Sequence, residues 1–154
     1  MNPLEPLIAC AGDWHGTSVL SDPHAGLKEE CASIARVVPL LGGRFVRFDY
    51  TWSYKGVPQE GSILFGFEKK PEILTAHWID GWHMSNKVMA CRGPRPSDAA
   101  FSVLGSYEAP PGPDWGWRID LAPEEDGTLR LTMFNRWPDG SQEDRAVEAI
   151  YTRG

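Results

Sequence analysis

Apolar and polar residues alternate along most of this chain in short runs, and turn-forming residues close each run. We count roughly ten such runs between residues 12 and 152. The clearest run covers residues 43–54, where Val46, Phe48, Tyr50 and Trp52 occupy even positions. A period of two is typical of a β-strand, because successive side chains point to opposite faces of the sheet. The pattern predicts an all-β protein, an antiparallel up-and-down barrel of about ten strands.

A short helix is expected before the strands, over residues 3–11, where Leu4, Leu7 and Ile8 share one side and can plug one end of the barrel. The Asp-Gly pairs at 126–127 and 139–140 predict hairpin turns, and the Pro-rich segment 109–114 predicts an exposed loop at the barrel mouth. The expected strands cover residues 13–20, 29–38, 43–54, 63–67, 73–84, 87–92, 101–107, 115–121, 129–134 and 143–152.

Composition limits the possible classes of function. A chain of 154 residues is expected to form a single domain over residues 1–154 with a sizeable core. The formal net charge is −6, and no basic cluster occurs, so we expect no nucleic-acid binding and no anionic membrane surface as partner. Three widely spaced cysteines, no signal-peptide pattern and no long apolar run indicate reduced thiols in a cytoplasmic protein.

Tryptophans and one aspartate are the candidate site. The chain holds 7 Trp, and a barrel face rich in indole rings suits a cavity for a small apolar or amphipathic molecule. Trp52 lies on the clearest strand, and the 73–84 run places Trp78, Asp80 and Trp82 on one face. We therefore predict that these four residues bind the ligand. Asp80 among indole rings either contacts the ligand or partners a buried indole N–H or an arginine.

Two other functions remain open from the residues alone. The barrel is a small-molecule lyase, isomerase or hydrolase if Asp80 or His77 serves as acid or base. Alternatively, it works without a ligand as a partner-binding or self-associating barrel, a homodimer for example, through an exposed aromatic patch around Trp115 and Trp117. His77 and His83 share a face of the expected 73–84 strand but lie about 20 Å apart, too far to share one metal ion.

Several motifs resemble a known family. Gly12-x-Trp14-x-Gly16 resembles the opening of the calycins, in which the tryptophan closes the barrel floor beneath an arginine of the last strand; Arg153 or Arg145 would take that place. Together with Leu41-Gly42-Gly43-Arg44-Phe45 and Trp78-x-Asp80, it resembles a bacterial family of uncharacterised calycin-like, lipocalin-like barrels. The likeness spans roughly residues 4–153. It implies a ten-stranded barrel and no particular activity.

A second resemblance raises the question of whether this barrel binds haem. Nitrobindin-like barrels open with a similar Gly-x-Trp-x-Gly and hold haem iron through a histidine late in the chain. Here the last histidine is His83, and 154 − 83 = 71 residues follow it without another. We therefore expect neither haem by that route nor any other cofactor or metal.

Overall fold

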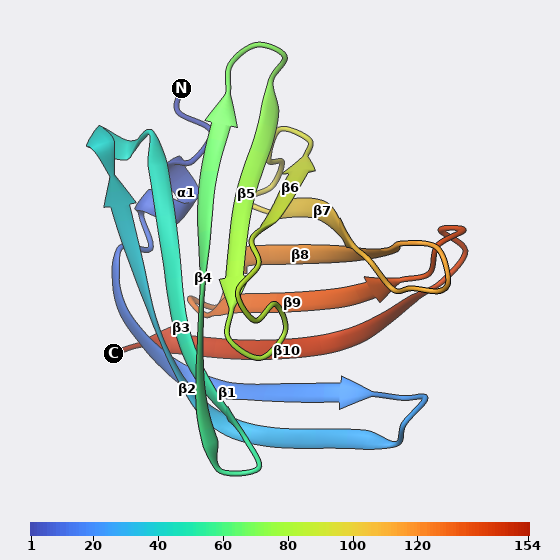
Figure 1. The fold of residues 1–154 in the computed structure, drawn as a ribbon. Coiled ribbons are helices and arrows are strands. Elements are labelled where there is room, and N and C mark those ends of the chain that lie inside the picture. The colour runs from blue at the N-terminus through green and yellow to red at the C-terminus, as the bar shows by residue number, and fades with distance from the viewer.

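The computed structural model describes all of residues 1–154. Ten antiparallel strands form one closed barrel in which each strand pairs with the next and β1 pairs with β10 (Figure 1). The elements are α1 Glu5–Ile8, β1 Gly12–Asp22, β2 Leu27–Leu40, η1 Leu41–Gly43, β3 Phe45–Tyr54, β4 Val57–Glu68, β5 Ile73–Asp80, β6 Met89–Gly93, β7 Phe101–Tyr107, β8 Trp115–Pro123, β9 Leu129–Arg136 and β10 Glu143–Arg153. The all-β barrel predicted from the alternation is therefore confirmed.

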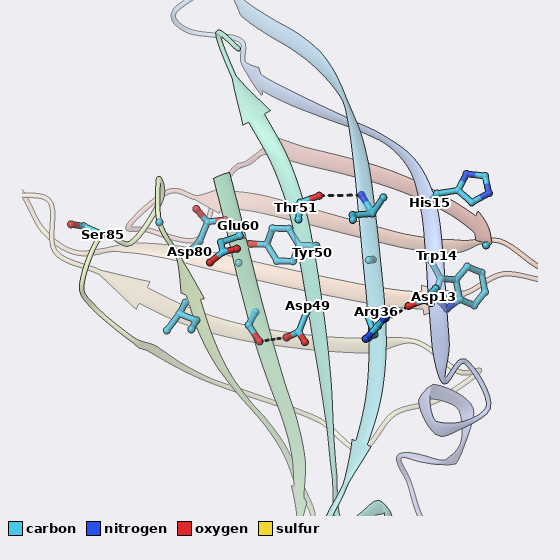
Figure 2. A pocket seen from close by; sticks show the side chains of 17 residues that line it. Asp13, Trp14, His15, Arg36, Asp49, Tyr50, Thr51, Glu60, Asp80 and Ser85 are labelled. Carbon is cyan, nitrogen blue, oxygen red and sulfur yellow. Dashed lines mark hydrogen bonds and ion pairs between the residues drawn. The ribbon is translucent and has the colours of Figure 1, made fainter. Parts of the chain in front are cut away.

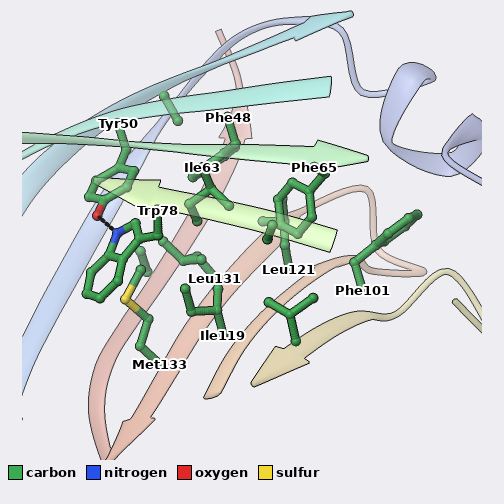
Figure 3. Packing of buried hydrophobic residues seen from close by; sticks show 14 of the residues in the cluster. Phe48, Tyr50, Ile63, Phe65, Trp78, Phe101, Ile119, Leu121, Leu131 and Met133 are labelled. Carbon is green, nitrogen blue, oxygen red and sulfur yellow. Dashed lines mark hydrogen bonds between the residues drawn. The ribbon is translucent and has the colours of Figure 1, made fainter. Parts of the chain in front are cut away.

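Alternate side chains of each strand point into the barrel, and most of these are large and apolar. In β3 the even positions Val46, Phe48, Tyr50 and Trp52 are buried, while their odd neighbours lie outside. The core comprises 30 buried residues, and Figure 3 shows rings and branched chains from β3, β4, β5, β8 and β9 meeting there. The barrel is packed along most of its length, as close packing of protein interiors requires.

Up-and-down topology gives the barrel two different ends. At one end lie α1, the start of β1 and the end of β10; at the other lie the segments 23–26, 55–56, 81–88, 108–114 and 137–142. Leu7 of α1 and Leu4, the residue before it, are buried at 0% and 1% exposure, so the helix covers its end. The opposite end, which we call the mouth, has no such cover. None of the helices is long and apolar enough to cross a membrane.

The helical end also closes the sheet. The guanidinium of Arg153 lies 4.6 Å from the centre of the Trp14 ring, and its nitrogens donate to the backbone carbonyls of Ala9 and Ala11 at 2.8 and 2.7 Å. The arginine thus joins the last strand, the first strand and the segment after α1. Of the two arginines expected over Trp14, Arg153 occupies the position.

Three expected boundaries were wrong. The strand expected over 63–67 begins at Val57 and pairs with β3 from there on. The helix covers only Glu5–Ile8 instead of 3–11, because the chain must turn into β1 at Gly12, whose φ of 117° suits glycine alone. The expected strand 73–84 ends at Asp80, because Asp80 begins a tight turn. The apolar residues beyond it continue the alternation in sequence but not in space.

Candidate functional site

Asp80, the last residue of β5, organises the mouth. Its Oδ1 accepts the backbone N–H groups of Trp82 and His83, both at 2.9 Å. Its Oδ2 accepts the Tyr50 hydroxyl at 2.6 Å and the Trp52 indole N–H at 3.3 Å. An aspartate that caps the amides two and three residues ahead stabilises a turn. The carboxylate therefore bends the chain so that residues 82 and 83 fold back over the mouth.

Tyr50 extends this network into the barrel. Its hydroxyl donates to Asp80 and accepts the Trp78 indole N–H at 2.9 Å, a bond drawn in Figure 3. Burial and the neighbouring Asp80 carboxylate raise the pKa of Tyr50 well above its ordinary value, so the phenol stays protonated. The ring crosses β4 at Gly61, where an added Cβ would lie 2.3 Å from the hydroxyl oxygen. Only glycine leaves room for it.

His83 lies in a cage of tryptophan rings. Its imidazole is 5.5 Å, centre to centre, from Trp52, 5.6 Å from Trp78 and 5.3 Å from Trp117. Burial lowers the pKa of His83 from its ordinary 6.5, although the Asp80 charge acts in the opposite direction. The ring is neutral at pH 7 and takes part in none of the hydrogen bonds within the protein. It is therefore held by packing alone.

Two hollows flank this caged histidine at the mouth. One of about 580 Å³ opens between the 82–90 segment and β7, and one of about 460 Å³ opens towards β1, β8 and β10. Behind them lies a cavity of about 10 Å³, roughly the space of one water molecule. A ligand would therefore occupy the mouth and not the barrel centre. The residues that line both hollows are Trp82, His83, Tyr107, Trp117 and Asn135.

Trp117 carries an unsatisfied polar group next to these hollows. The indole N–H groups of the buried Trp14, Trp52 and Trp78 all have acceptors. The Nε1 of Trp117 is buried and has none. A buried donor without a partner costs about 1–3 kcal/mol. The other such atom, Asp120 Oδ1, belongs to a carboxylate that already pairs with Arg118.

A larger hollow of about 840 Å³ lies across strands β1 to β5 (Figure 2). Its polar side chains largely pair with one another: Arg36 bonds Asp13 at 2.6 Å and Ser62 bonds Asp49 at 2.7 Å. Figure 2 shows these groups along the strands with no convergence on a common point. Self-paired, half-exposed charges offer little to a ligand, so we place the candidate site at the mouth.

The four residues predicted from the sequence to bind a ligand occupy different positions around the mouth. Trp52, Trp78 and Asp80 are buried together: Trp52 donates to Asp80 directly, and Trp78 is joined to it through the Tyr50 hydroxyl. Trp82 is 41% exposed at the rim. Of the two roles weighed for Asp80, the structure shows the cap of buried indole and backbone N–H groups, because its oxygens already hold four donors.

Two other expectations were wrong. His77 and His83 do not share a face: His77 is exposed on the outside of β5, since the strand ends three residues later, while His83 turns inward. An acid or base at His77 would therefore lie outside the barrel. Trp117, expected in an exposed patch with Trp115, is only 5% exposed. It lies on the same face of β8 as Ile119 and Leu121, and that face points into the barrel.

From the sequence, His83 and Trp117 were left outside the predicted ligand-binding residues, and Asn135 was not singled out at all. The Asp80-Gly81 pair is a turn signal that would have moved His83 to the mouth, and the alternation of β8 would have placed Trp117 inside. No local pattern marks Asn135. No group of His, Cys, Asp or Glu side chains gathers closely enough to hold a metal ion.

The family model described as "Protein of unknown function (DUF1579)" matches residues 4–153. The chain belongs to this DUF1579 family. The match covers the extent that the sequence motifs suggested, and the family description assigns no activity to the DUF1579 barrel. No curated protein matches the chain.

Solved structures share the architecture of the DUF1579 barrel. The crystal structure of Rv2717c from M. tuberculosis is similar with a TM-score of 0.66 and 13% sequence identity, over 100% of this chain and 98% of that one. At this identity the likeness establishes the shared fold alone. The fold of this barrel is thus known by experiment in a distant sequence.

Proposed function

We propose that this barrel binds a small apolar or amphipathic molecule at its mouth, against the tryptophan cage around His83. One observation carries the proposal: hollows of about 580 and 460 Å³ meet at shared aromatic side chains, while the rest of the barrel is filled. An apolar concavity with few polar groups is the usual form of a small-molecule site. Trp78 and Trp82 would contact the ligand directly, and Trp52 and Asp80 would hold the cage in position.

We also propose that this barrel is related to the calycins, as the sequence motifs led us to expect. Support comes from Trp14 at the covered end with Arg153 across its ring, 4.6 Å away, which is the arrangement that the resemblance implied. In such a barrel one end is closed and the other admits the ligand. The mouth is the end left uncovered here.

Tryptophan-labelled protein provides the test, because the indole N–H signals report on each ring separately. Protein labelled with ¹⁵N-tryptophan is titrated with a set of small aromatic compounds, and we expect the signals of Trp78, Trp82 and Trp117 to shift while Trp14, at the other end, stays constant. Trp82→Ala should weaken binding. Ile79→Ala, three positions earlier on the outer face and 47% exposed, should not. Shifts confined to Trp14, or none, would contradict the proposal.

Native mass spectrometry identifies a ligand carried from the cell. A mass adduct that is lost on denaturation supports a carrier and narrows the chemical class of its ligand. A bare dimer, together with the absence of indole shifts, would instead favour the self-associating barrel.

A further inference from the structure

The mouth holds a set of hydrogen-bond donors whose partner is missing from the protein. Trp117 on β8 and Asn135 on β9 are direct cross-strand partners, so their side chains stand next to each other on one face of the sheet. The Nε1 of Trp117 is buried without an acceptor. Both residues line both hollows. The pair therefore lies where the two hollows meet.

The orientation of Asn135 leaves its amide nitrogen free. The Tyr107 hydroxyl donates to Asn135 Oδ1 at 2.5 Å, which turns the Nδ2 hydrogens away from Tyr107. That nitrogen makes no hydrogen bond within the protein, and Asn135 is half-buried at the mouth. Two residues paired directly across the β8–β9 ladder thus each carry a donor, an indole N–H and an amide N–H, with no acceptor in the protein.

We propose that the ligand is a flat aromatic molecule with an uncharged carbonyl oxygen, which accepts hydrogen bonds from Trp117 Nε1 and Asn135 Nδ2. This inference rests on the proposed function and names the class of ligand for the same site. Indole rings on several sides favour a flat aromatic body. An oxygen with two lone pairs can accept from both donors at once.

The charges around the mouth favour a neutral ligand over a carboxylate. The two hollows are lined by two basic residues, Lys87 and Arg145, and by three acidic ones, Glu108, Asp22 and Asp144. This rim gives no net attraction for an anion. The buried donors are likewise uncharged, so an uncharged acceptor satisfies them without the cost of removing a charge from water.

The ligand reaches the indole N–H when His83 moves aside. The Trp117 nitrogen is enclosed by its neighbours, and the imidazole of His83, whose centre lies 5.3 Å from the Trp117 ring, makes no hydrogen bond that resists displacement. His83 lines the two mouth hollows and also the small inner cavity. A flat ring that takes the place of the imidazole would lie between the same tryptophans.

The test compares three probes of similar size: naphthalene, with no acceptor; coumarin, with a neutral carbonyl; and 2-naphthoate, with a carboxylate. We expect coumarin to bind about tenfold more tightly than naphthalene, the effect of one added hydrogen bond of ordinary strength, and to move the Trp117 indole proton signal downfield. Trp117→Phe keeps the aromatic ring and loses the N–H, so it should abolish the preference for coumarin. Trp14→Phe, at the covered end, should retain it.

The outcomes separate this inference from the proposed function. If naphthalene binds at the mouth and coumarin binds no better, or if the preference survives in Trp117→Phe, the carbonyl assignment is wrong and the site stands. If 2-naphthoate binds best, the ligand is an anion and the assignment is again wrong. If none of the three probes binds, the proposed function fails with it. Asn135→Leu, at a half-buried position, gives a second variant in case Trp117→Phe does not fold.

Discussion

The carboxylate of Asp80 holds the mouth of the barrel in shape. Four donors meet its two oxygens: the Tyr50 hydroxyl, the Trp52 indole and the backbone amides of Trp82 and His83. Asp80 is 2% exposed, so water cannot replace these bonds. At this scale, one side chain determines both the end of β5 and the position of the histidine within the cage.

Asp80→Ala should therefore destabilise the protein by about 3 kcal/mol or more, since each buried donor left without a partner costs about 1–3 kcal/mol. Urea unfolding followed by tryptophan fluorescence measures the loss. Asp49→Ala is the matched control: Asp49 pairs with Arg47 on the half-exposed outer face, and we expect it to cost less than about 1 kcal/mol. Equal losses in the two variants would contradict the structural role of Asp80.

The caged imidazole of His83 gives the stability a pH dependence. Because burial lowers the pKa of His83 below 6.5, the unfolded chain takes up a proton that the folded chain resists. Stability is then complete above pH 6.5 and is lost as the pH falls through the lower pKa of the folded state. Between about pH 7.5 and about pH 5.5, the wild type should lose more stability than His83→Gln.

Urea midpoints at the two pH values measure this difference. His77→Gln removes an imidazole that faces water outside the barrel, and it should retain the pH dependence of the wild type. If His83→Gln lost as much stability as the wild type on acidification, the dependence would have to arise from another group.

Among the strands, the seam between β6 and β7 is the weakest part of the wall. The β1–β2 ladder runs without interruption from Gly12 to Asp22, whereas β6 and β7 share a single paired position, Arg92 with Leu104. Towards the mouth the two strands separate, and the hollow of about 580 Å³ opens between residues 87–90 and 106–108. The ligand site is thus next to the least paired segment of the sheet.

Backbone amides of residues 89–91 and 105–107 that point into this seam should exchange with deuterium at least about tenfold faster than those of β1 and β2, because local opening requires few broken bonds there. Hydrogen exchange followed by NMR resolves the individual amides. A flat aromatic ligand should slow this exchange. Equal protection on both sides of the barrel would show that the seam is as stable as the rest.

At the scale of the whole molecule, closure and filling together confine function to one end. The ring of ten strands leaves no free sheet edge, α1 covers one end, and a core of 30 buried residues occupies the interior. The mouth combines open space with a buried donor that has no acceptor, the indole N–H of Trp117. A larger ligand cavity of the open-barrel type would require a smaller residue at an inner position such as Trp78 or Phe48.

Much of the fold could be predicted because the alternation is local. Apolar residues at the even positions of 45–54 predicted which side chains of β3 lie inside. The two Asp-Gly pairs predicted two hairpins. The end of β5 escaped prediction because Asp80, Trp82 and Met84 continue the period of two, while the side chain of Asp80 forms the turn. In β10 the register shifts between Arg145 and Val147, and such a bulge changes the inward face without a sign in the pattern.

The sequence by itself determined the strand content, the antiparallel order and the richness in tryptophan, because these follow from periodicity and composition. Only the tertiary structure decided that Trp117 has no acceptor, that His83 lies among Trp52, Trp78 and Trp117 and that Asn135 is adjacent to Trp117. The contacts of His83 and Trp117 join β3, β5 and β8, which are distant along the chain, and they arise when the barrel closes. The Trp117–Asn135 pair depends on the exact register of the β8–β9 hairpin, which the alternation alone does not fix.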